Sequence, residues 1–583
     1  MFHFSLQRNK FIGGVIMLYI ILLSFIAPVL IWLGFIATAN PADRRTTIVN
    51  GAWILISLVI LKIIQTYVWL PSRNPLSLLG ANLIWGAVSL AAFYFLFRAT
   101  TDSSLNRTTI AAGAGLLVLV IIVGGGEAHS AFSVKSVAQS IQSKKVSSKA
   151  APTFKKGVTP VALSPKTVKN RMNKNMSDVP NSQYFHLGDI QAQYYHGKPV
   201  YIAPVEFDGF FKYLSAKQRT PGYFIIDATS VNAEPKFVRK AMKYTNASYF
   251  NNNAQRHIYQ DYPQWLVADN SEPQLEVDEN GTPYYIETTY KSMALSHRIN
   301  YSKLHVIAVN AVTGKTNLYS LKNLPSWIDE GITSDVADYM NTAYGKYQRG
   351  WLNMHLSKTG IQVPTNSEVI STFDRQGQVQ YFTDFTNPRS DADSALGYSM
   401  INARTGKLVY YKTHGIMDSD GAKNNADNNY KAQQWKSSMP VIYNINGKPT
   451  WVLSILDGTS AFRGYYYIDA SDQSVHATGD NANEAVDNFR QALVDSGTSA
   501  GNTAGAKLKT ISGTVSRAVI VTKSNNQALL FTLSGSNTVY TVDGDDFQKA
   551  LLTQTGDKIT AKAYVVKSKS IGNVEKFVNT NLK

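Results

Sequence analysis

Four polar positions recur in this sequence where they could form a shared binding site. Asp227, Asn310, Asn402 and Asp469 each end a strand-like run and precede Ala. Carboxylate and amide oxygens repeated in this way could contact a protein partner. Asp and Asn side chains also accept hydrogen bonds from the backbone a short distance ahead, which is typical of residues that cap turns. The pattern favours turn caps and leaves partner binding open as the alternative at these four positions.

The other motifs that could do chemistry are weak. Residues 497–501 fit the G-x-S-x-G pattern of serine hydrolases, but a predicted helix precedes them and a small-residue run surrounds them, which is typical of a linker. Residues 418–421 lack the further ligands of a calcium loop. The histidines lack the spacing of a zinc site, and the absence of cysteine excludes thiol nucleophiles and Cys-ligated metals. We expect no catalytic residue, cofactor or metal, although the carboxylate pair of a glycosidase leaves no recognisable spacing.

One two-strand pattern occurs four times between residues 182 and 495. A turn with Gly leads into an aromatic strand, and a second strand then ends in Asp-Ala or Asn-Ala. The pairs are 196–202 with 222–230, 281–286 with 306–315, 377–382 with 397–407, and 447–452 with 464–474. Apolar residues at helical spacing follow the copies, most clearly at 328–340 and 483–493. The sequence predicts four antiparallel sheets, each covered on one side by a helix, that support one another because one unit alone is too small to be stable.

These residues resemble a known family. The Gly-Lys-Pro-x-Tyr turn, the Gly-Tyr strand that ends in Asp-Ala, and the Thr-Gly-Lys turn are similar to the PepSY domain, an α+β module found mostly outside the bacterial cytoplasm. The resemblance covers pieces of residues 185–495, and the long spacing between the two halves of the first two copies departs from the family pattern. It implies a binding, inhibitory or regulatory module and carries over no catalytic residue.

The C-terminal residues 507–583 follow a small-residue linker at 496–506 and are rich in strands. We expect strands at 511–515, 528–533, 538–542 and 558–566, with a helical turn at 547–552. That order resembles a small all-β, OB-like barrel. Such barrels often bind single-stranded nucleic acid on stacking aromatic residues, but aromatic residues are sparse in this segment and we expect no nucleic-acid partner.

Residues 1–125 carry four apolar runs, at 11–37, 51–70, 76–97 and 109–123. Each is near the roughly 20 residues needed to cross a bilayer as a helix, so the fold class at this end is a transmembrane helical anchor. Lys62 is the one ionisable residue well inside a run, and the scarcity of polar residues disfavours a channel or transporter subunit. Four spans place both termini on one side. Arg44, Arg45, Arg98 and Arg107 favour an outside N-terminus, whereas Arg8, Lys10 and Arg73 favour the reverse. The Lys-rich stretch after the fourth run favours a cytoplasmic C-terminal region, but the PepSY resemblance favours an extracytoplasmic one.

Much of the positive charge of the chain lies between the anchor and the repeats. The net charge is +17, and residues 129–177 hold ten Lys or Arg and no Asp or Glu. We predict that residues 126–181 form a flexible Lys/Ser-rich linker, since this composition buries little apolar surface. Lys144, Lys145, Lys155 and Lys156 could contact an anionic lipid or wall polymer.

Together these features predict a multi-pass cell-membrane protein of the bacterial envelope. Its large C-terminal region would bind an envelope protein or polymer without catalysis. An enzyme that acts on cell-wall polymers is the alternative function.

Overall fold

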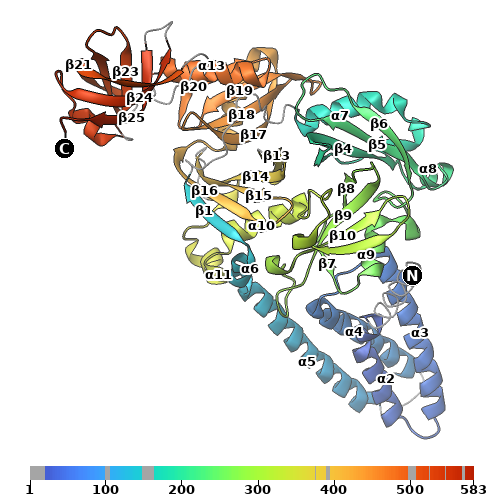
Figure 1. Cartoon of the computed structure of the whole chain (residues 1–583). Coiled ribbons are helices and arrows are strands. Elements are labelled where there is room, and N and C mark those ends of the chain that lie inside the picture. The colour runs from blue at the N-terminus through green and yellow to red at the C-terminus, as the bar shows by residue number, and fades with distance from the viewer. Residues whose placement is uncertain are drawn as a thin grey trace.

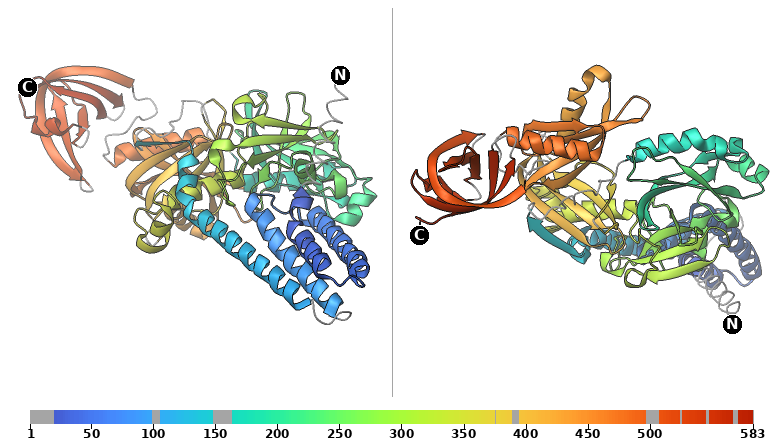
Figure 2. Two further views of the ribbon diagram at one scale, coloured as in Figure 1. Left: turned by 90° about the horizontal axis from the view of Figure 1, so that it is seen from below. Right: turned by 45° about the horizontal axis from the view of Figure 1, so that its top comes forward.

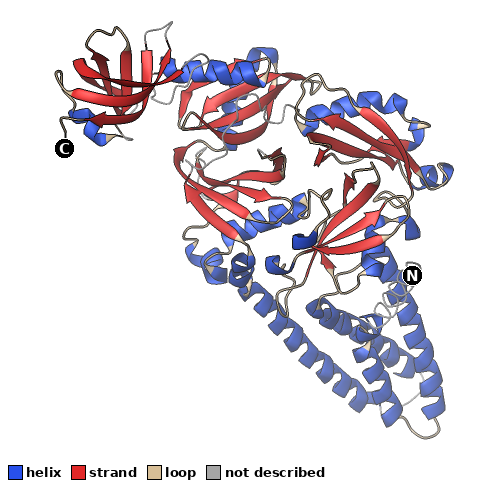
Figure 3. Ribbon diagram, in the orientation of Figure 1, coloured by secondary structure: helices blue, strands red, loops and turns tan. Residues whose placement is uncertain are grey.

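The computed structural model describes residues 20–98, 105–147, 163–374, 376–388, 394–496, 507–523, 526–544, 547–566 and 571–582. Over these residues the chain forms a group of long helices, four β-sheets and a C-terminal barrel (Figures 1 and 3). The helices lie at one end of the molecule and the barrel lies at the far end, beyond the fourth sheet (Figure 2).

Three helices are long and apolar enough to cross a membrane: α3 (Arg44–Trp69), α4 (Pro75–Arg98) and α5 (Leu105–Phe132). A fourth helix, α2 (Ile26–Thr38), is apolar but shorter, and residues 11–19 of the expected first span lie outside the described residues. Ile31, Phe35 and Phe93 form a small core among these helices. Lys62 donates a hydrogen bond to Gln65 Oε1 on its own helix at 3.1 Å, so the charged group has a polar partner inside the span.

The first two sheets follow the predicted copies. The first sheet contains β2 (Phe185–Leu187), β3 (Gln191–Tyr195), β4 (Lys198–Phe207), β5 (Thr220–Asp227) and β6 (Lys236–Met242), with α7 (Pro165–Lys174) before it and α8 (Phe210–Ser215) between β4 and β5. The second contains β7 (Leu266–Val267), β8 (Gln274–Val277), β9 (Pro283–Tyr290), β10 (His305–Asn310) and β11 (Thr316–Ser320), with α9 (Ala254–Asp261) before it.

The third and fourth sheets follow the same plan. The third contains β1 (Ser143–Ser147), β12 (Val363–Pro364), β13 (Ile370–Phe373), β14 (Val379–Thr386), β15 (Ala395–Asn402) and β16 (Leu408–Ile416), with α10 (Ser334–Lys346) before it. The fourth contains β17 (Lys436–Ile445), β18 (Lys448–Leu456), β19 (Phe462–Asp469) and β20 (Asp472–Gly479), between α12 (Ser419–Asn429) and α13 (Ala482–Asp495).

The two strands of every predicted copy are neighbours in the structure. They form the antiparallel pairs β4–β5, β9–β10, β14–β15 and β18–β19. The recurring Asx residue lies opposite the start of the partner strand in each pair, for example Asp227 opposite Val200 and Asp469 opposite Thr450. The prediction that the two strands of each copy form an antiparallel pair is therefore confirmed, although the third sheet also contains one parallel strand, β1.

The helices cover the sheets differently from the prediction. The helix predicted after the second copy is α10, but it packs on β12 and β14 of the third sheet, where Val336 and Met340 join the same core as Tyr381. The α7 helix likewise packs on the sheet that follows it in the chain, which is the first sheet. Helical periodicity located α10 and α13, but it could not show which sheet each helix covers.

The expectation that each sheet is covered on one side is wrong. The central strands β4, β9, β14 and β19 each contain a run of consecutive buried residues, and the fourth sheet shows this clearly. Tyr465, Tyr466, Tyr467 and Ile468 of β19 are all buried, although successive residues of a strand point to opposite faces. The core around them includes Phe489 of α13 and Phe382 of the third sheet. Because tyrosine and isoleucine suit both faces of a doubly covered strand, alternation alone gave the wrong answer.

The predicted flexible linker at 126–181 is also wrong where it is described. The α5 helix continues to Phe132, α6 (Val134–Ser140) follows, and β1 pairs in parallel with β16 of the third sheet. The α7 helix buries Val168 and Met172. A Lys-rich segment remains a flexible tether only when no other part of the chain pairs with it. Here β16, at the edge of a distant sheet, supplies hydrogen bonds to β1.

The C-terminal strands form a closed barrel in the order β21–β22–β23–β25–β24. The strands are β21 (Lys507–Lys523), β22 (Asn526–Leu533), β23 (Val539–Asp543), β24 (Lys558–Val566) and β25 (Ile571–Asn579). The four predicted strands and the helical turn η9 (Gln548–Leu552) are present. The sequence analysis missed β25, which closes the barrel by pairing in parallel with β23.

Candidate functional site

The four recurring Asx residues cap turns. Asp227 Oδ1 accepts hydrogen bonds from the backbone nitrogen of Thr229 at 2.8 Å and from its hydroxyl at 2.6 Å. Asn310 Oδ1 accepts from the nitrogens of Val312 and Thr313. Asn402 Oδ1 accepts from the nitrogen and hydroxyl of Thr405, and Asp469 Oδ1 accepts from the nitrogen of Ser471. They end strands in four different sheets, and the structure does not bring them together.

The basic residues named in the sequence analysis do not form one patch in the described part of the chain. Lys144 and Lys145 are exposed on β1, and the Nζ atom of Lys145 lies 5.9 Å from the ring centroid of Tyr344. Lys155 and Lys156 lie outside the described residues, as do residues 497–501 of the nucleophile-like motif. The calcium-like motif is a helix start, because Asp418 caps α12 by accepting a hydrogen bond from Gly421 N at 2.9 Å.

The four sheets surround a cavity of about 690 Å³. Its lining comes from every one of them: from β4 and the loop before β3, from β8 and β9, from the start of α10 and the loop before β13, and from α12 and β17. In Figure 1 the four sheets stand around this central region. Six carboxylates line the cavity, namely Asp189, Glu206, Glu272, Asp335, Asp338 and Glu368. Three lysines also line it, Lys166, Lys169 and Lys423, the last of which is paired with Asp420 at 2.6 Å.

Two of the carboxylates are placed by α10. Thr333 precedes the helix, Asp335 lies in its first turn, and Asp338 follows three residues later on the same side. An acidic residue in the first turn is favoured by the helix dipole. The other face of α10 carries Val336 and Met340 into the core, so packing directs the two carboxylates towards the cavity.

The alternation of side chains between the two faces of β4 determines which way Glu206 points. Tyr201, Ala203 and Val205 face one core, and Val200 and Ile202 face the other, so Glu206 lies on the side of the second sheet. Tyr285 donates a hydrogen bond to Glu206 Oε1 at 3.3 Å. The loop before β3 passes close to this carboxylate at Gly188, where a Cβ atom would lie 2.7 Å from Pro204 Cγ and 2.9 Å from Glu206 Cδ. Any side chain at this position would displace Glu206 or the loop.

Burial and, after it, the neighbouring carboxylates raise the pKa of four cavity carboxyl groups. Burial, together with Asp189 and Glu272, raises the pKa of Glu206 to about 7, against the hydrogen bond from Tyr285. Burial, followed by Asp335 and Glu368, raises the pKa of Asp338 to about 8. Burial and neighbouring carboxylates also raise the pKa of Glu272 and of Asp335. Protons or a bound cation would relieve the repulsion among these groups, so the cavity is suited to a positively charged ligand.

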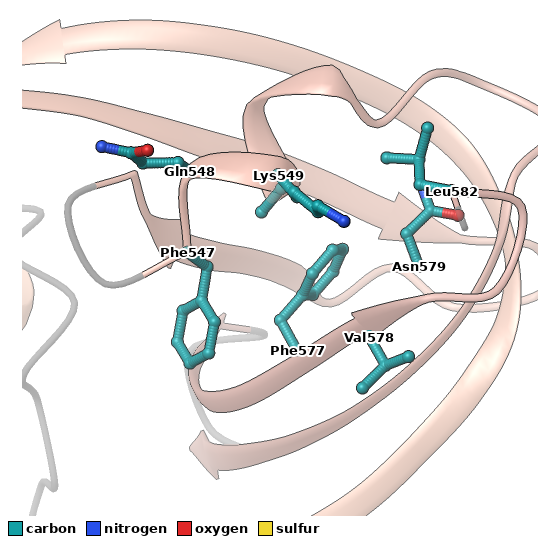
Figure 4. A pocket seen from close by; sticks show the side chains of 8 residues that line it. Phe547, Gln548, Lys549, Phe577, Val578, Asn579 and Leu582 are labelled. Atoms are coloured by element: carbon teal, nitrogen blue, oxygen red, sulfur yellow. The ribbon is translucent and has the colours of Figure 1, made fainter.

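A second pocket, of about 490 Å³, lies on the barrel. Its lining includes Phe547, Lys549, Phe577 and Leu582, and Figure 4 shows Lys549 and the two phenylalanines close together around it. No acidic side chain is among the residues that line it in the described part of the barrel. This pocket is smaller than the central cavity and is formed by one domain alone.

The sequence analysis did not identify the cavity carboxylates. Only the Asp335–Asp338 spacing, which places two acids on one side of a helix, gave a local signal. The other four come from separate loops and strands of the first three units, and only the packing of the units brings them together. Among the described residues no group of three or more His, Cys, Asp or Glu residues is arranged to hold a metal ion.

Comparisons with known proteins do not place the chain in a family. No family model and no curated protein matches it. Among solved structures, Bacillus subtilis levansucrase aligns with a TM-score of 0.16 and 9% identity over 73% of this chain and 97% of that chain. A Synechocystis apocarotenoid oxygenase mutant aligns with a TM-score of 0.13 and 6% identity over 68% of this chain and 62% of that chain. TM-scores this low carry no argument about fold or function.

Proposed function

We propose that the chain is a membrane-anchored binding protein of the bacterial cell envelope that holds a positively charged ligand in its central cavity. The observation that carries this proposal is the convergence of four repeated units on one cavity lined by six carboxylates. A binding function accounts for the repeated units without catalysis, because each unit contributes surface to the cavity. The four units would be PepSY-like modules, which is supported by the paired Gly-aromatic and Asx-Ala strands at the centre of each sheet. The barrel would be OB-like, which is supported by its strand order and by the helical turn between its third and fourth strands.

The cavity would release protons when a cation binds. Glu206 and Asp338 have raised pKa values of about 7 and about 8, so both are partly protonated near neutral pH. A bound cation favours their ionised forms and lowers both pKa values. Affinity for a cationic ligand should therefore increase as the pH rises from about 6 to 8.

Removing two ionisable carboxyl groups from the cavity should weaken binding. In the full-length protein in lipid nanodiscs, the double substitution Asp335→Asn and Asp338→Asn should weaken the binding of a fluorescent pentalysine probe at least about tenfold, or about 1.4 kcal/mol. Fluorescence anisotropy at constant ionic strength measures this dissociation constant. The matched control is Glu279→Gln, which removes an exposed carboxylate from the turn of the second sheet and should leave the affinity unchanged. Equal affinities for the double variant and the unmodified protein would contradict the proposal.

A second candidate function is hydrolysis of a cell-wall polymer. The observation that favours it is a carboxyl group of raised pKa, Asp338, in a cavity with other carboxylates, since glycosidases use one protonated and one ionised carboxyl group. Incubating the purified protein with purified cell wall distinguishes the two functions. Binding without soluble products supports the first, and release of sugar fragments that Asp338→Asn abolishes supports the second.

We propose that the sheets lie outside the cytoplasm. Arg44 and Arg45 begin α3, Arg98 ends α4, and Arg107 lies in the first turn of α5. Figure 1 shows these helix ends away from the sheets, and positive loops favour the cytoplasm. Arg73 lies at the other end, but the second sheet's domain engages it: it donates to the carbonyl oxygens of Tyr259 at 2.5 Å and Trp265 at 3.4 Å. The position of Arg73 therefore reflects packing between the helices and the second sheet's domain. It is weaker evidence for membrane topology than the other four arginines.

Cysteine labelling tests this topology, because the chain has no cysteine of its own. A single Thr459→Cys variant, exposed on the fourth sheet, should react with a membrane-impermeant maleimide in intact cells. A single Ala42→Cys variant, in the exposed loop before α3, should react only after lysis. The reverse pattern would place the sheets in the cytoplasm.

A further inference from the structure

An exposed aromatic patch lies on the first sheet's domain, away from the central cavity. Phe211 of α8 is 80% exposed, and Phe250 of the short helix η4 (Phe250–Asn252) is 53% exposed. Phe210 joins them, with ring centroids 5.7 Å from Phe211 and 5.9 Å from Phe250. Leu214 is also exposed. We call these four residues the aromatic patch. Four large apolar side chains gathered on a surface indicate a contact with another apolar phase or partner.

The aromatic patch is continuous with the end of a predicted membrane span. Tyr67, near the end of α3, donates a hydrogen bond to Asn251 Oδ1 at 3.5 Å, and Asn251 is the neighbour of Phe250. Arg256 of α9 donates to the carbonyl oxygen of Tyr67, and its guanidinium group lies 3.9 Å from the ring centroid of Tyr67. In Figure 1 α8 and α9 lie on the same side of the molecule as α3. These contacts hold the aromatic patch beside the C-terminal end of α3, where the apolar sequence of that helix ends.

The residues around this point are those that prefer the interface of a membrane. Trp69 of α3 is 71% exposed, and Trp and Tyr are enriched at the headgroup level of membrane helices. Exposed Lys217 and Arg219 follow α8 and are suited to anionic headgroups. Exposed aromatic and leucine side chains beside basic residues are the combination that binds at the interface of an anionic membrane.

We propose that the aromatic patch inserts into the headgroup region of the membrane that holds the anchor. The first sheet's domain then rests on the bilayer at α8 and η4, while α9 is clamped to the end of α3. Two contacts, one with lipid and one with the anchor, fix the height and tilt of the sheets above the membrane. The orientation of the central cavity relative to the bilayer follows from them. This inference requires the membrane anchor but does not depend on which ligand the cavity binds.

The absence of cysteine makes the test specific. The variants Phe211→Cys and Phe250→Cys, each labelled with the fluorophore NBD, are reconstituted as full-length protein in nanodiscs with and without lipids carrying a shallow nitroxide quencher. We expect quenching at both positions to be at least twofold stronger than at Leu552→Cys. Leu552 is the matched control, since it is a 64% exposed apolar residue on the distant barrel.

Three outcomes decide the inference. Strong quenching at Phe211 and Phe250 with weak quenching at Leu552 supports it. Quenching equal to that of the control overturns it. Blue-shifted emission at the patch without lipid quenching also overturns it, because a protein surface rather than lipid would then cover the patch. Both substituted side chains are exposed, so the variants should fold, and thermal unfolding of the labelled proteins verifies this.

Discussion

Replacing Ile468 with Asp should unfold the fourth unit or destabilise it by about 4 kcal/mol, because an unpaired carboxylate would enter a fully buried position. Ile468 lies on β19, is 0% exposed and is paired with residues of β18 and β20. The core around it includes Phe382 of the third sheet, so the loss should extend beyond one unit. Thermal unfolding of the full-length protein in nanodiscs, followed by circular dichroism, measures the effect.

The control for this variant is Gln473→Asp on β20, which adds the same carboxylate at an exposed position of the same sheet. Its unfolding should match that of the unmodified protein. If both variants unfold at the temperature of the unmodified protein, the assignment of β19 as a doubly covered strand is wrong. If the fourth unit alone unfolded in a separate transition at a lower temperature, the units would not stabilise one another.

Stability should fall as the pH rises from about 5 to 8. Burial raises the pKa of Glu287 to about 8 and, with Asp329 as a further cause, that of Glu330 to about 8. A carboxyl group whose pKa is raised in the folded state is protonated there and ionised in the unfolded chain at intermediate pH. Folding then takes up a proton, so this contribution to stability is present below the unfolded pKa of about 4.3 and is lost as the pH rises through the folded pKa.

The substitution Glu287→Gln tests one of these groups. Glu287 Oε1 accepts a hydrogen bond from Ser271 Oγ at 2.8 Å, and an amide oxygen can accept the same bond. The variant should reduce the dependence of the unfolding free energy on pH by about 1.4 kcal/mol per unit between about pH 5 and 7. Chemical denaturation at several pH values measures this slope. A stability that is flat or rises with pH over this range would contradict the predicted protonation of these buried carboxyl groups.

Local patterns in the sequence determined several features of this protein. Apolar runs near the length of a bilayer predicted the helical end, and three of them are helices long enough to span it. Repeated Gly-aromatic and Asx-Ala strands predicted four sheets, since the same two-strand pattern occurs four times in the sequence. The Asx turns are local for the same reason, because Asp227 and Asn310 accept bonds from residues only two or three positions ahead.

The tertiary structure alone decided how these parts meet. The Lys-rich residues 143–147 form a strand because the edge of β16, more than 250 residues later, is free to pair with them. The composition of residues 126–181 carries no information about that edge and predicts a tether. The strand β25 was also missed; it pairs along most of its length with its neighbour β24, and only its parallel pairing with the more distant β23, which closes the barrel, depends on the tertiary structure.

The candidate site depends most strongly on this long-range packing. Asp335 and Asp338 share a side of one helix, and the sequence determines that much. Glu206 and Glu368 join them only because the first and third sheets pack around the same cavity. The raised pKa values follow from that convergence, since burial and neighbouring carboxylates cause them and both arise from the arrangement of the four units in space.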